Sequence, residues 1–354
     1  MYVKELTIKN FRNHNYLTYE FSEKMNAIIG ENGVGKTNLV EAIYYLSLAR
    51  SFRTRNEEEL VKIGKESASI EATTFNGTTK HKIKVVFIKE GRKIFIDDKP
   101  ISKLSELSKL INIILFEPKD VMLFKGPPSN RRNYLDISIS KKSPTYLGYI
   151  SQYDKLLEER NAILKQDKVD ETLLEATTEM MVRLSGPIVS YRQQYIQDIN
   201  NILDKIVYAL TGERVHAKIE YEPFVPYDSN FEENAKKAFK RAQESDLKKK
   251  ATSIGIHRED FEMSLNNRKI ASFGSQGENR IVAIALKLSP FFLIEDKEKR
   301  PIVILDDVMS ELDKNHQDRL IEFLRKFQQV FITGTKLDLK DVKTCVLTRK
   351  GEKA

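Results

Sequence analysis

Alternating hydrophobic and polar residues mark most of the first hundred positions. Residues 3–8 alternate with period two, and Met25–Ile29 is a short apolar run before a glycine-rich segment, so both are predicted to be strands. Asn76-Gly77 separates two further β-rich runs, which is a strong signal for a hairpin. Apolar residues recur at helical spacing over 37–48. The pattern therefore predicts strands and hairpins around one helix, followed by a buried strand at 111–116.

Helical spacing dominates the middle of the chain. It predicts one helix over 146–164 and one or two more over 173–210, interrupted at Gly186-Pro187 because proline breaks the helical hydrogen-bond pattern. A further helix over 234–250 carries seven basic and two acidic residues. Strand character returns at 260–265. A mainly helical section is therefore set between two strand-containing ends.

The glycine-rich segment matches the phosphate-loop pattern G-x-x-x-x-G-K-[ST] in full and lies between a strand and an amphipathic helix. Its glycines let successive backbone N–H groups point at phosphate oxygens, at the positive end of the following helix. Lys36 is expected to reach the β- and γ-phosphates of ATP, and the Thr37 hydroxyl to bind Mg²⁺. The alternative is a strand-to-helix turn without a ligand. We predict an ATP site formed by Gly30, Glu31, Asn32, Gly33, Val34, Gly35, Lys36 and Thr37.

A pair of aspartates, which are further candidate site residues, follows the apolar run Ile302–Leu305. Such a run is typical of a strand buried on both faces of a parallel sheet, and ligands bind at the carboxyl ends of these strands. Asp306 is the candidate for holding Mg²⁺, and Asp307 the candidate for polarising the attacking water. We therefore predict Lys36 and Asp307 as the catalytic residues. The alternative is that the two aspartates only end a strand before a turn.

Ser275, Gln276 and Gly277 precede a helix rich in apolar residues. Ser275 and Glu278 fit the S-x-x-E capping box, which by itself accounts for both residues. A capped helix N-terminus also binds anions, so the same segment is a candidate for contacting a γ-phosphate held by a second subunit. Ser310 and Asp313, just after the aspartate pair, form a turn that is expected at the same subunit interface.

Composition and charge narrow the class of protein only moderately. The net charge of +8, with 40% hydrophobic and 31% charged residues, excludes a disordered tail or a disulfide scaffold, and the chain has a single cysteine, Cys345. The longest apolar stretch, 281–294, is too short to cross a membrane and is interrupted by Lys287 and Pro290. No signal-peptide pattern is present at the N-terminus. We expect a soluble, cytoplasmic protein without a membrane partner.

The order of these motifs resembles that of ABC-type ATPase heads. The closer resemblance is to the SMC-related DNA-repair ATPases, and within them to the RecF family. It covers nearly the whole chain and rests on several separate segments. These are residues 8–13, 38–42, 51–53, 115–120, 125–132, 160–161, 255–260, 273–277 and 305–313.

This resemblance implies an α/β fold, namely an ABC/SMC-type P-loop ATPase head with an inserted, mainly helical second domain. We expect residues 1–119 and 252–354 to form the head and residues 120–251 to form the insert. The resemblance adds Asn38 and Arg12 to the ATP site. It implies an ATP-dependent, head-to-tail homodimer that binds duplex, gapped or single-stranded DNA. It further implies cooperation with RecO and RecR in loading RecA, and slow hydrolysis that resets the complex.

Three features depart from the ABC pattern. Asp306-Asp307 stands where an Asp-Glu pair is usual, no glutamine lies near Phe116 as a γ-phosphate sensor, and no histidine follows the strand at 329–332. Ile256 also stands where the family usually has proline. These departures concern the residues around the γ-phosphate more than the phosphate loop itself.

The densest basic features are Arg131-Arg132 and the helix at 234–250, which ends in Lys248, Lys249 and Lys250. Binding to DNA phosphates needs only positive charge on one face, so no base-reading motif is required. These five residues are our candidates for DNA contact. The alternative is a solvated helix face.

Three other functions remain open at this stage. An ATPase subunit of an ABC transporter shares the motifs, but the 270 positions between Lys36 and Asp306 and the basic helical insert favour the repair protein. A DNA-binding module that uses ATP only to hold its interface together is distinguished by its lack of turnover. A P-loop kinase requires a lid and an acceptor site, for which the sequence offers no candidates.

Overall fold

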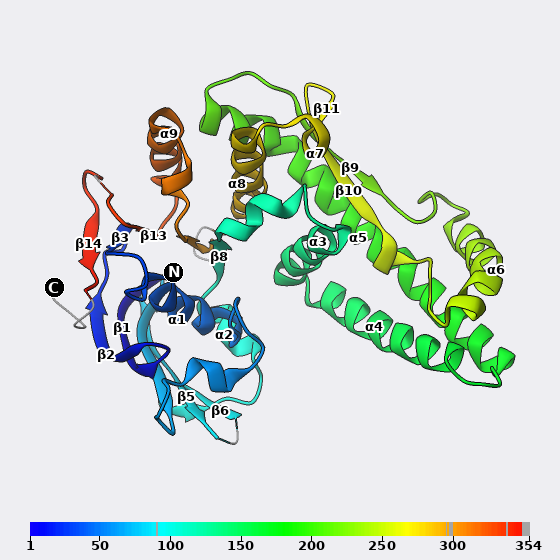
Figure 1. The fold of residues 1–354 in the computed structure, drawn as a ribbon, viewed down its shortest axis with the longest axis horizontal. Coiled ribbons are helices and arrows are strands. Elements are labelled where there is room, and N and C mark those ends of the chain that lie inside the picture. The colour runs from blue at the N-terminus through cyan, green and yellow to red at the C-terminus, as the bar shows by residue number, and fades with distance from the viewer. Residues whose placement is uncertain (90, 295, 297–299, 338, 349–354) are drawn as a thin grey trace. The chain divides into compact units, whose positions relative to one another are not determined.

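Residues 1–89, 91–294, 296, 300–337 and 339–348 are described by the computed structural model. They form two compact units, which are treated separately below (Figure 1). The first unit consists of Met1–Asp120, Ala209–Gly212 and the described residues from Phe291 onward. The second consists of Val121–Tyr208 and Glu213–Pro290.

Two sheets form the framework of the first unit. The parallel sheet has the order β14-β3-β13-β12-β8 and contains β3 (Met25–Ile29), β8 (Ile113–Phe116), β12 (Ile302–Leu305), β13 (Val330–Gly334) and β14 (Lys343–Val346). The antiparallel sheet has the order β2-β1-β4-β5-β6-β7 and contains β1 (Tyr2–Phe11), β2 (His14–Glu20), β4 (Ala68–Asn76), β5 (Thr79–Ile88), β6 (Gly91–Ile96) and β7 (Lys99–Pro100).

The predicted strands and hairpin of this unit are confirmed. Both β3 and β12 have the predicted bounds, and all four residues of β12 are buried, as expected for a strand covered on both faces. The strands β4 and β5 pair antiparallel across the Asn76-Gly77 turn, where Gly77 has a φ of 59°. The parallel strands place the ends of β3 and β12 at one edge of the sheet, where the candidate site lies.

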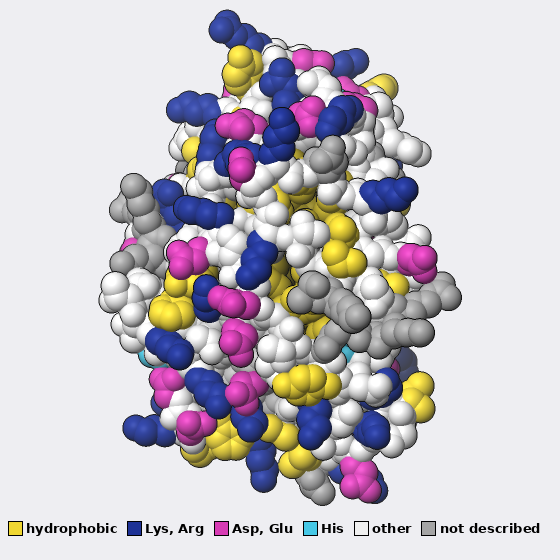
Figure 2. Space-filling view, turned by 90° about the vertical axis from the view of Figure 1, so that its left-hand side faces the viewer, with side chains coloured by type: hydrophobic (Ala, Val, Ile, Leu, Met, Phe, Trp, Pro, Cys, Tyr) yellow, Lys and Arg dark blue, Asp and Glu magenta, His cyan; other side chains and the backbone are white. Residues whose placement is uncertain are grey.

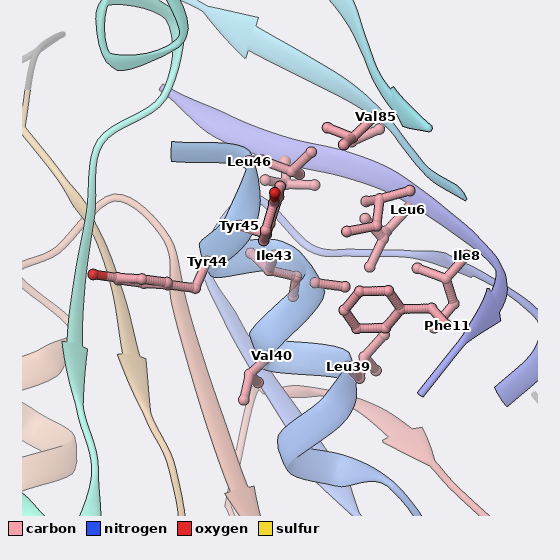
Figure 3. Packing of buried hydrophobic residues seen from close by; sticks show 14 of the residues in the cluster. Leu6, Ile8, Phe11, Leu39, Val40, Ile43, Tyr44, Tyr45, Leu46 and Val85 are labelled. Carbon is pink, nitrogen blue, oxygen red and sulfur yellow. The ribbon is translucent and has the colours of Figure 1, made fainter. Parts of the chain in front are cut away.

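Helix α1 (Lys36–Leu48) is central to the core of the first unit. Figure 3 shows Leu39, Ile43 and Leu46 among the side chains of Leu6, Ile8 and Phe11 of β1, while Tyr44 points away from this group. Residues on nearly every side of α1 are buried, which is typical of a helix enclosed by other elements. This packing fixes the start of α1, and with it the end of the phosphate loop.

Four further helical segments among the described residues of the first unit lie outside this core helix. They are α2 (Ser105–Leu110), α9 (Lys314–Leu324) and the short 3₁₀ helices Glu57–Leu60 and Met309–Glu311.

The second unit is mainly helical and contains one small sheet. Its helices are α3 (Pro128–Lys142), α4 (Pro144–Leu164), most of α5 (Glu171–Thr211), α6 (Phe231–Lys249), α7 (Ile270–Phe273) and most of α8 (Gln276–Phe292). The sheet has the order β11-β10-β9, formed by β9 (Ala217–Glu222), β10 (Asp260–Leu265) and β11 (Arg268–Lys269). Within the described part of the chain, no helix combines the length and apolarity needed to cross a membrane.

The predicted helix break at Gly186-Pro187 is wrong, because α5 continues through both residues. A proline inside a helix costs about 3 kcal/mol, since it removes one N–H and crowds the preceding turn. Here Val182, Ile188 and Val189 on either side of it are almost fully buried. Burial of several such side chains, at about 1.5–3 kcal/mol each, outweighs the cost of one proline.

The boundary of the second unit also differs from the predicted insert at 120–251. The unit extends to Pro290, because β10 pairs antiparallel with β9 along its whole length. Helix α8 is tied to the same unit, since the Tyr134 hydroxyl donates a hydrogen bond to the Leu286 carbonyl oxygen at 2.8 Å. Residues 252–290 therefore pack with the helical unit, whereas we assigned them to the head.

Candidate nucleotide-binding site

The phosphate loop connects β3 to α1 and turns through left-handed backbone conformations. Gly33 has a φ of 83° and Gly35 a φ of 106°, which side chains rarely allow. A Cβ atom at Gly35 would overlap the His14 ring and would lie 2.7 Å from Asn13 Oδ1. Glycine is therefore required at position 35 both for its φ and for the close approach of the β1–β2 turn.

The side chain of Lys36 folds back over the loop. Its Nζ donates hydrogen bonds to the carbonyl oxygens of Gly30 at 2.7 Å and Glu31 at 2.9 Å, although the residue is largely buried. Gly35 is the N-cap residue of helix α1, and no described side chain caps the helix. Its first amide N–H groups and the lysine ammonium thus belong to one loop, which suits an anion such as a phosphate. Of the other predicted members, Glu31, Asn32 and Gly33 are exposed, Val34 is buried, and Thr37 and Asn38 are half-buried.

The turn between β1 and β2 supports the phosphate loop, and we did not predict this role. His14 Nε2 lies 3.2 Å from the Gly35 carbonyl oxygen, and Asn13 Nδ2 donates to the Val34 carbonyl oxygen at 3.3 Å. Asn13 Oδ1 also accepts a hydrogen bond from Asn38 at 2.7 Å. Burial lowers the pKa of His14, so the neutral ring is favoured at this position. Two polar residues in a turn carry no sequence signal for this role.

The second predicted element, Asp306, meets the phosphate loop. Asp306 Oδ1 accepts hydrogen bonds from Thr37 Oγ1 at 3.2 Å and from Thr333 Oγ1 at 2.7 Å. Burial raises the pKa of Asp306, the two threonine hydroxyls oppose this shift, and the neighbouring Asp307 adds to it. The structure thus brings together two predicted metal-binding residues that are 269 positions apart in the chain.

The oxygens of Thr37 and Asp306 fit a bound Mg²⁺, because Mg²⁺ prefers hard oxygen ligands and is usually held by one or two protein oxygens together with phosphates and waters. The contact between the two side chains shows that both reach the same point at the end of β12. No protein cage with more ligands is required for a magnesium ion that arrives with ATP.

Asp307 follows directly and is held in a left-handed conformation with a φ of 51°. Its backbone N–H donates to Thr333 Oγ1 at 2.8 Å, and its carbonyl oxygen accepts from Ser310 Oγ at 3.1 Å. Asp313 caps α9 by accepting from the His316 N–H at 3.0 Å. Ser310 and Asp313, the predicted dimer turn, are both exposed, although each makes a local hydrogen bond.

Arg12, predicted to contact ATP, takes part in a buried ion-pair network. It donates to both carboxylate oxygens of Glu41, at 2.9 and 2.6 Å, and to the Glu59 carbonyl oxygen at 3.0 Å. Glu41 lies on α1, its side chain is fully buried, and it also accepts from Ser51 and from Arg53. The contact between Arg12 and ATP therefore remains a proposal.

Arg53 is a further residue of the site that we did not predict. Its side chain is 42% exposed, contacts Asn38 Oδ1 at 2.6 Å, and lies close enough to Asp306 to favour the ionised carboxylate. The sequence offered the segment 51–53 only as part of the family resemblance. Its position beside the loop depends on Glu41, whose role as an ion-pair partner no local pattern revealed.

The Ser275 segment belongs to the second unit, and the predicted capping box is confirmed. Ser275 Oγ accepts from the Glu278 N–H at 3.1 Å, and the Ser275 N–H donates to Glu278 Oε2 at 2.7 Å. The hydrogen bond that the Ser275 N–H donates to the carboxylate lowers the pKa of Glu278. Ser275, Gln276 and Gly277 are not enclosed by other residues, so the start of α8 faces solvent in the described structure.

The basic candidates of the second unit differ in how accessible they are. Arg131 is buried and donates to both carboxylate oxygens of Asp260 at 2.7 Å and to three backbone carbonyl oxygens. Its guanidinium is therefore committed to internal contacts, so we withdraw it as a DNA candidate. Arg132 is half-buried, and Arg258, which we did not select, is exposed nearby. Lys249 and Lys250 are exposed, and Lys248 pairs with Glu244 at 2.6 Å.

The charge of +8 does not gather into one patch on the face shown in Figure 2. Lys and Arg side chains are interspersed there with Asp and Glu. Several lysines of α6 are likewise paired with glutamates one turn away, at Lys236–Glu232, Lys237–Glu233 and Lys248–Glu244. Such exposed pairs reduce the charge available to a phosphate backbone.

Comparison with known proteins identifies the family. The family model described as the RecF/RecN/SMC N terminal domain matches residues 2–350. The DNA replication and repair protein RecF of Exiguobacterium sp. is 36% identical over 347 residues, which cover 96% of this chain and 93% of that protein. The chain belongs to the RecF family. This membership favours the repair class of ATPase over the transporter subunit.

Solved structures agree with this RecF-family assignment. A structure of the recombination mediator protein RecF–ATP in the RecFOR pathway has a TM-score of 0.84 and 32% identity, covering 98% of this chain and 97% of that one. The SMC head domain of Pyrococcus furiosus, bound to the C-terminal domain of ScpA, has a TM-score of 0.56 and 17% identity over 95% and 90% of the two chains. The second likeness shows the fold alone. The predicted α/β fold of the ABC/SMC-type ATPases is confirmed, and the chain is a member of a family of ATP-binding ATPases.

Proposed function

We propose that this RecF-family chain is an ATP-dependent DNA-binding protein of recombinational repair and replication-fork recovery. The observation that carries the proposal is the meeting of Thr37 and Asp306, with Thr37 Oγ1 and Asp306 Oδ1 3.2 Å apart beside a complete phosphate loop. A loop of this kind binds a nucleoside triphosphate, and the adjacent carboxylate suits the accompanying Mg²⁺. The relatives named above as DNA replication and repair proteins support the biological role.

In this proposal each residue of the site has a separate task. The backbone N–H groups of Gly33, Gly35 and the first turn of α1 hold phosphate oxygens, and Lys36 neutralises the β- and γ-phosphates. Thr37 and Asp306 hold Mg²⁺, which supplies neutralisation of the phosphate charge when bound. Asp307 orients and polarises the attacking water, and Thr333 keeps the two aspartates in register. Hydrolysis is proposed to be slow and to reset the complex.

The second half of each site is proposed to come from another copy of the chain. Ser275, Gln276 and Gly277 then face the γ-phosphate held by the partner subunit, and the turn containing Ser310 and Asp313 lies at the interface. The exposure of all five residues supports this head-to-tail arrangement. Functionally, the head would then comprise residues 1–119 and 252–354, even though residues 252–290 pack with the helical unit.

DNA is proposed to bind through phosphate contacts of Arg132, Lys248, Lys249 and Lys250, with Arg258 as a further candidate. The exposure of the three lysines and of Arg258 supports their proposed contacts with DNA phosphates. The solved RecF structure is described as part of the RecFOR pathway, which supports RecO and RecR as partners in placing RecA on single-stranded gaps. A protein of this type binds duplex or gapped DNA electrostatically, so its affinity falls as salt rises.

ATP turnover and sedimentation, measured with and without duplex DNA, test the proposal. Asp307→Asn is expected to reduce turnover about 100-fold or more while ATP binding remains, because only the water-activating group is changed. Ser275→Arg is expected to leave ATP binding by the monomer intact and to prevent ATP-dependent dimers. Lys65→Ala, a change at an exposed lysine of the same unit, is the control and should behave as the unaltered protein.

Three outcomes would overturn parts of this proposal. Normal dimerisation of Ser275→Arg with ATP would remove the role of the partner subunit. Equal turnover by Asp307→Asn and the unaltered protein would leave ATP as a structural ligand only. An affinity for duplex DNA that does not change between low and high salt would exclude the proposed phosphate contacts.

A further inference from the structure

Asn279 holds the turn that leads into α8. It is 1% exposed, and its side-chain Nδ2 donates to three backbone carbonyl oxygens: Gly274 at 3.0 Å, Ser275 at 2.8 Å and Ile270 at 3.3 Å. The Ser275 carbonyl also accepts the helical hydrogen bond from the Asn279 N–H at 3.0 Å. One buried amide therefore connects the first residue of α7, the turn after α7 and the first residue of the Ser275 segment.

The site requires a nitrogen donor at this position. Exchanging the amide oxygen and nitrogen would place Oδ1 against three carbonyl oxygens, which repel it. In the present orientation, Asn279 Oδ1 is buried without a hydrogen-bond partner among the residues that the structure describes. Leaving such an acceptor unpaired costs about 1–3 kcal/mol. The three donor contacts of Asn279 are therefore kept despite the free-energy cost of burying its unpaired Oδ1. An apolar side chain of similar size would not have this cost.

Gly274 is fitted to the same arrangement. A Cβ atom at this residue would lie 2.6 Å from the Ile270 carbonyl oxygen and 2.8 Å from Asn279 Nδ2, which is closer than real Cβ contacts. Gly274 has an ordinary φ of −73°, so the restriction comes from space alone. The turn is therefore packed tightly around the Asn279 amide.

Ser275 is fixed from two sides as a result. Glu278 holds its N–H and its hydroxyl, while Asn279 holds its carbonyl oxygen. Helix α7 ends with Gly274 as its C-cap residue, whose N–H donates to the Ile270 carbonyl oxygen, so this end does not depend on the contact between Asn279 and Ser275. The additional contact to Ser275 limits rotation of the residue whose side chain and following N–H groups are exposed.

We propose that Asn279 is a positioning residue, which presets Ser275 to receive the phosphate of a nucleotide held by a second copy of this chain. This inference rests on the proposed function, because it assumes that Ser275 acts across the dimer. Asn279 touches neither ATP nor the partner and acts through the orientation of Ser275. Its effect should therefore appear in assembly and turnover, and not in ATP binding by the single chain.

Asn279→Asp tests the proposal, because the ionised carboxylate has nearly the same shape and no donor. We expect ATP affinity of the monomer to stay within about twofold, and the dissociation constant of the ATP-dependent dimer to rise at least about tenfold, which corresponds to the loss of one or two hydrogen bonds. Asn267→Asp places the same charge at an exposed turn of the same unit and is the matched control. Sedimentation with ATP measures the dimer, and fluorescent ATP titration measures the monomer.

Asn279→Ser decides the outcome if Asn279→Asp does not fold, since serine keeps one donor and adds no charge. It should form dimers more weakly than the unaltered protein, with an unchanged melting temperature to within a few degrees. A dimer as tight as that of Asn267→Asp would overturn the proposal, as would a loss of ATP affinity equal to the loss of dimerisation. If Ser275→Arg dimerises normally, the proposed function itself fails; if Ser275→Arg blocks dimers and Asn279→Asp does not, only this inference fails.

Discussion

Helices α1 and α8 both start at a turn that we propose for phosphate binding, but the two starts are built differently. Helix α1 has Gly35, with a φ of 106°, as its N-cap residue, and no described side chain caps it. Helix α8 begins with a reciprocal capping box between Ser275 and Glu278. The first N–H groups of α1 therefore have no side-chain acceptor and remain available to a ligand in the phosphate loop. At the start of α8, one N–H group already has the Ser275 hydroxyl as its acceptor.

This difference indicates two kinds of phosphate contact. The loop before α1 offers backbone donors and Lys36 together, which suits strong binding by a single chain. The start of α8 offers a hydroxyl and the N–H groups of Gln276 and Gly277, without a lysine in the turn. We therefore expect the α1 loop to bind ATP first and the α8 start to contact it afterwards, as the weaker partner.

The largest expected effect is that of Lys36→Ala on the α1 side. Loss of a charged donor to phosphate removes about 2–3 kcal/mol, so ATP affinity should fall about 30- to 150-fold, and ATP-dependent dimers should be lost with it. Calorimetric titration with ATP and Mg²⁺ measures the affinity, with Lys65→Ala as the control. Unchanged affinity in Lys36→Ala would show that the lysine contributes nothing to ATP binding, so that it does not distinguish the α1 start from the α8 start.

Substituting one glycine at each helix start should affect the stability of the α1 start much more than that of the α8 start. Gly35→Ala should destabilise the first unit by about 2–3 kcal/mol, because alanine is strained at a φ of 106° and its Cβ meets His14. Gly277→Ala should be neutral or stabilising by up to about 1 kcal/mol, since a Cβ there has nothing within 4 Å and lies in a helix. Thermal unfolding of both variants checks this, and equal melting temperatures would refute the difference.

Removing the cap on α8 should have a smaller effect. Ser275→Ala loses the hydrogen bond to the Glu278 N–H and is expected to destabilise the second unit by about 1 kcal/mol. Ser275→Thr retains the capping oxygen and serves as the control. Denaturant unfolding of the two variants provides the measurement, and identical midpoints would show that the cap contributes nothing to stability.

The smallest effect is a difference in pH response between the two starts. Burial lowers the pKa of His14 below its usual 6.5, so the unfolded chain takes up a proton first and the α1 loop loses stability as pH falls below about 6.5. Hydrogen bonds from Ser275 lower the pKa of Glu278 below its usual 4.5, so the α8 cap keeps its full stability until pH falls below about 4.5.

Hydrogen exchange at pH 7.5 and 5.5, corrected for the intrinsic rate, separates these responses. Amides of the α1 loop should exchange faster at pH 5.5, while those at the start of α8 should not change. His14→Gln, which has no titrating ring, should remove the change in the loop. A loop that responds equally in this variant would show that another group is responsible.

Local features of the fold could be predicted from the sequence. The bounds of β3, β10 and β12 follow directly from apolar runs and alternation, and the phosphate loop from its glycines. The meeting of Thr37 with Asp306 also followed, because parallel strands bring their carboxyl ends to one edge. Each of these features depends on a few neighbouring residues or on a general rule of sheet topology.

Features that depend on distant partners could not be predicted in the same way. Residues 252–290 belong to the helical unit because β10 pairs with β9. No local sequence pattern specifies which partner a strand will pair with. Arg131 and Arg132 are adjacent in sequence, but Arg131 donates to both carboxylate oxygens of Asp260, 129 positions away, whereas Arg132 donates to the Glu259 carbonyl oxygen. A run of basic residues does not reveal which of its members is neutralised inside the protein.

The network around Glu41 has a consequence for how sequences of this family can vary. Its carboxylate is fully buried and has Arg12 and Arg53 as ion-pair partners, contributed by separate segments. Removing one partner of a buried ion pair typically costs about 3–5 kcal/mol, because an uncompensated charge remains. A neutral residue at position 41 is therefore tolerated only with changes at positions 12 and 53, and we expect these three positions to be inherited as a set.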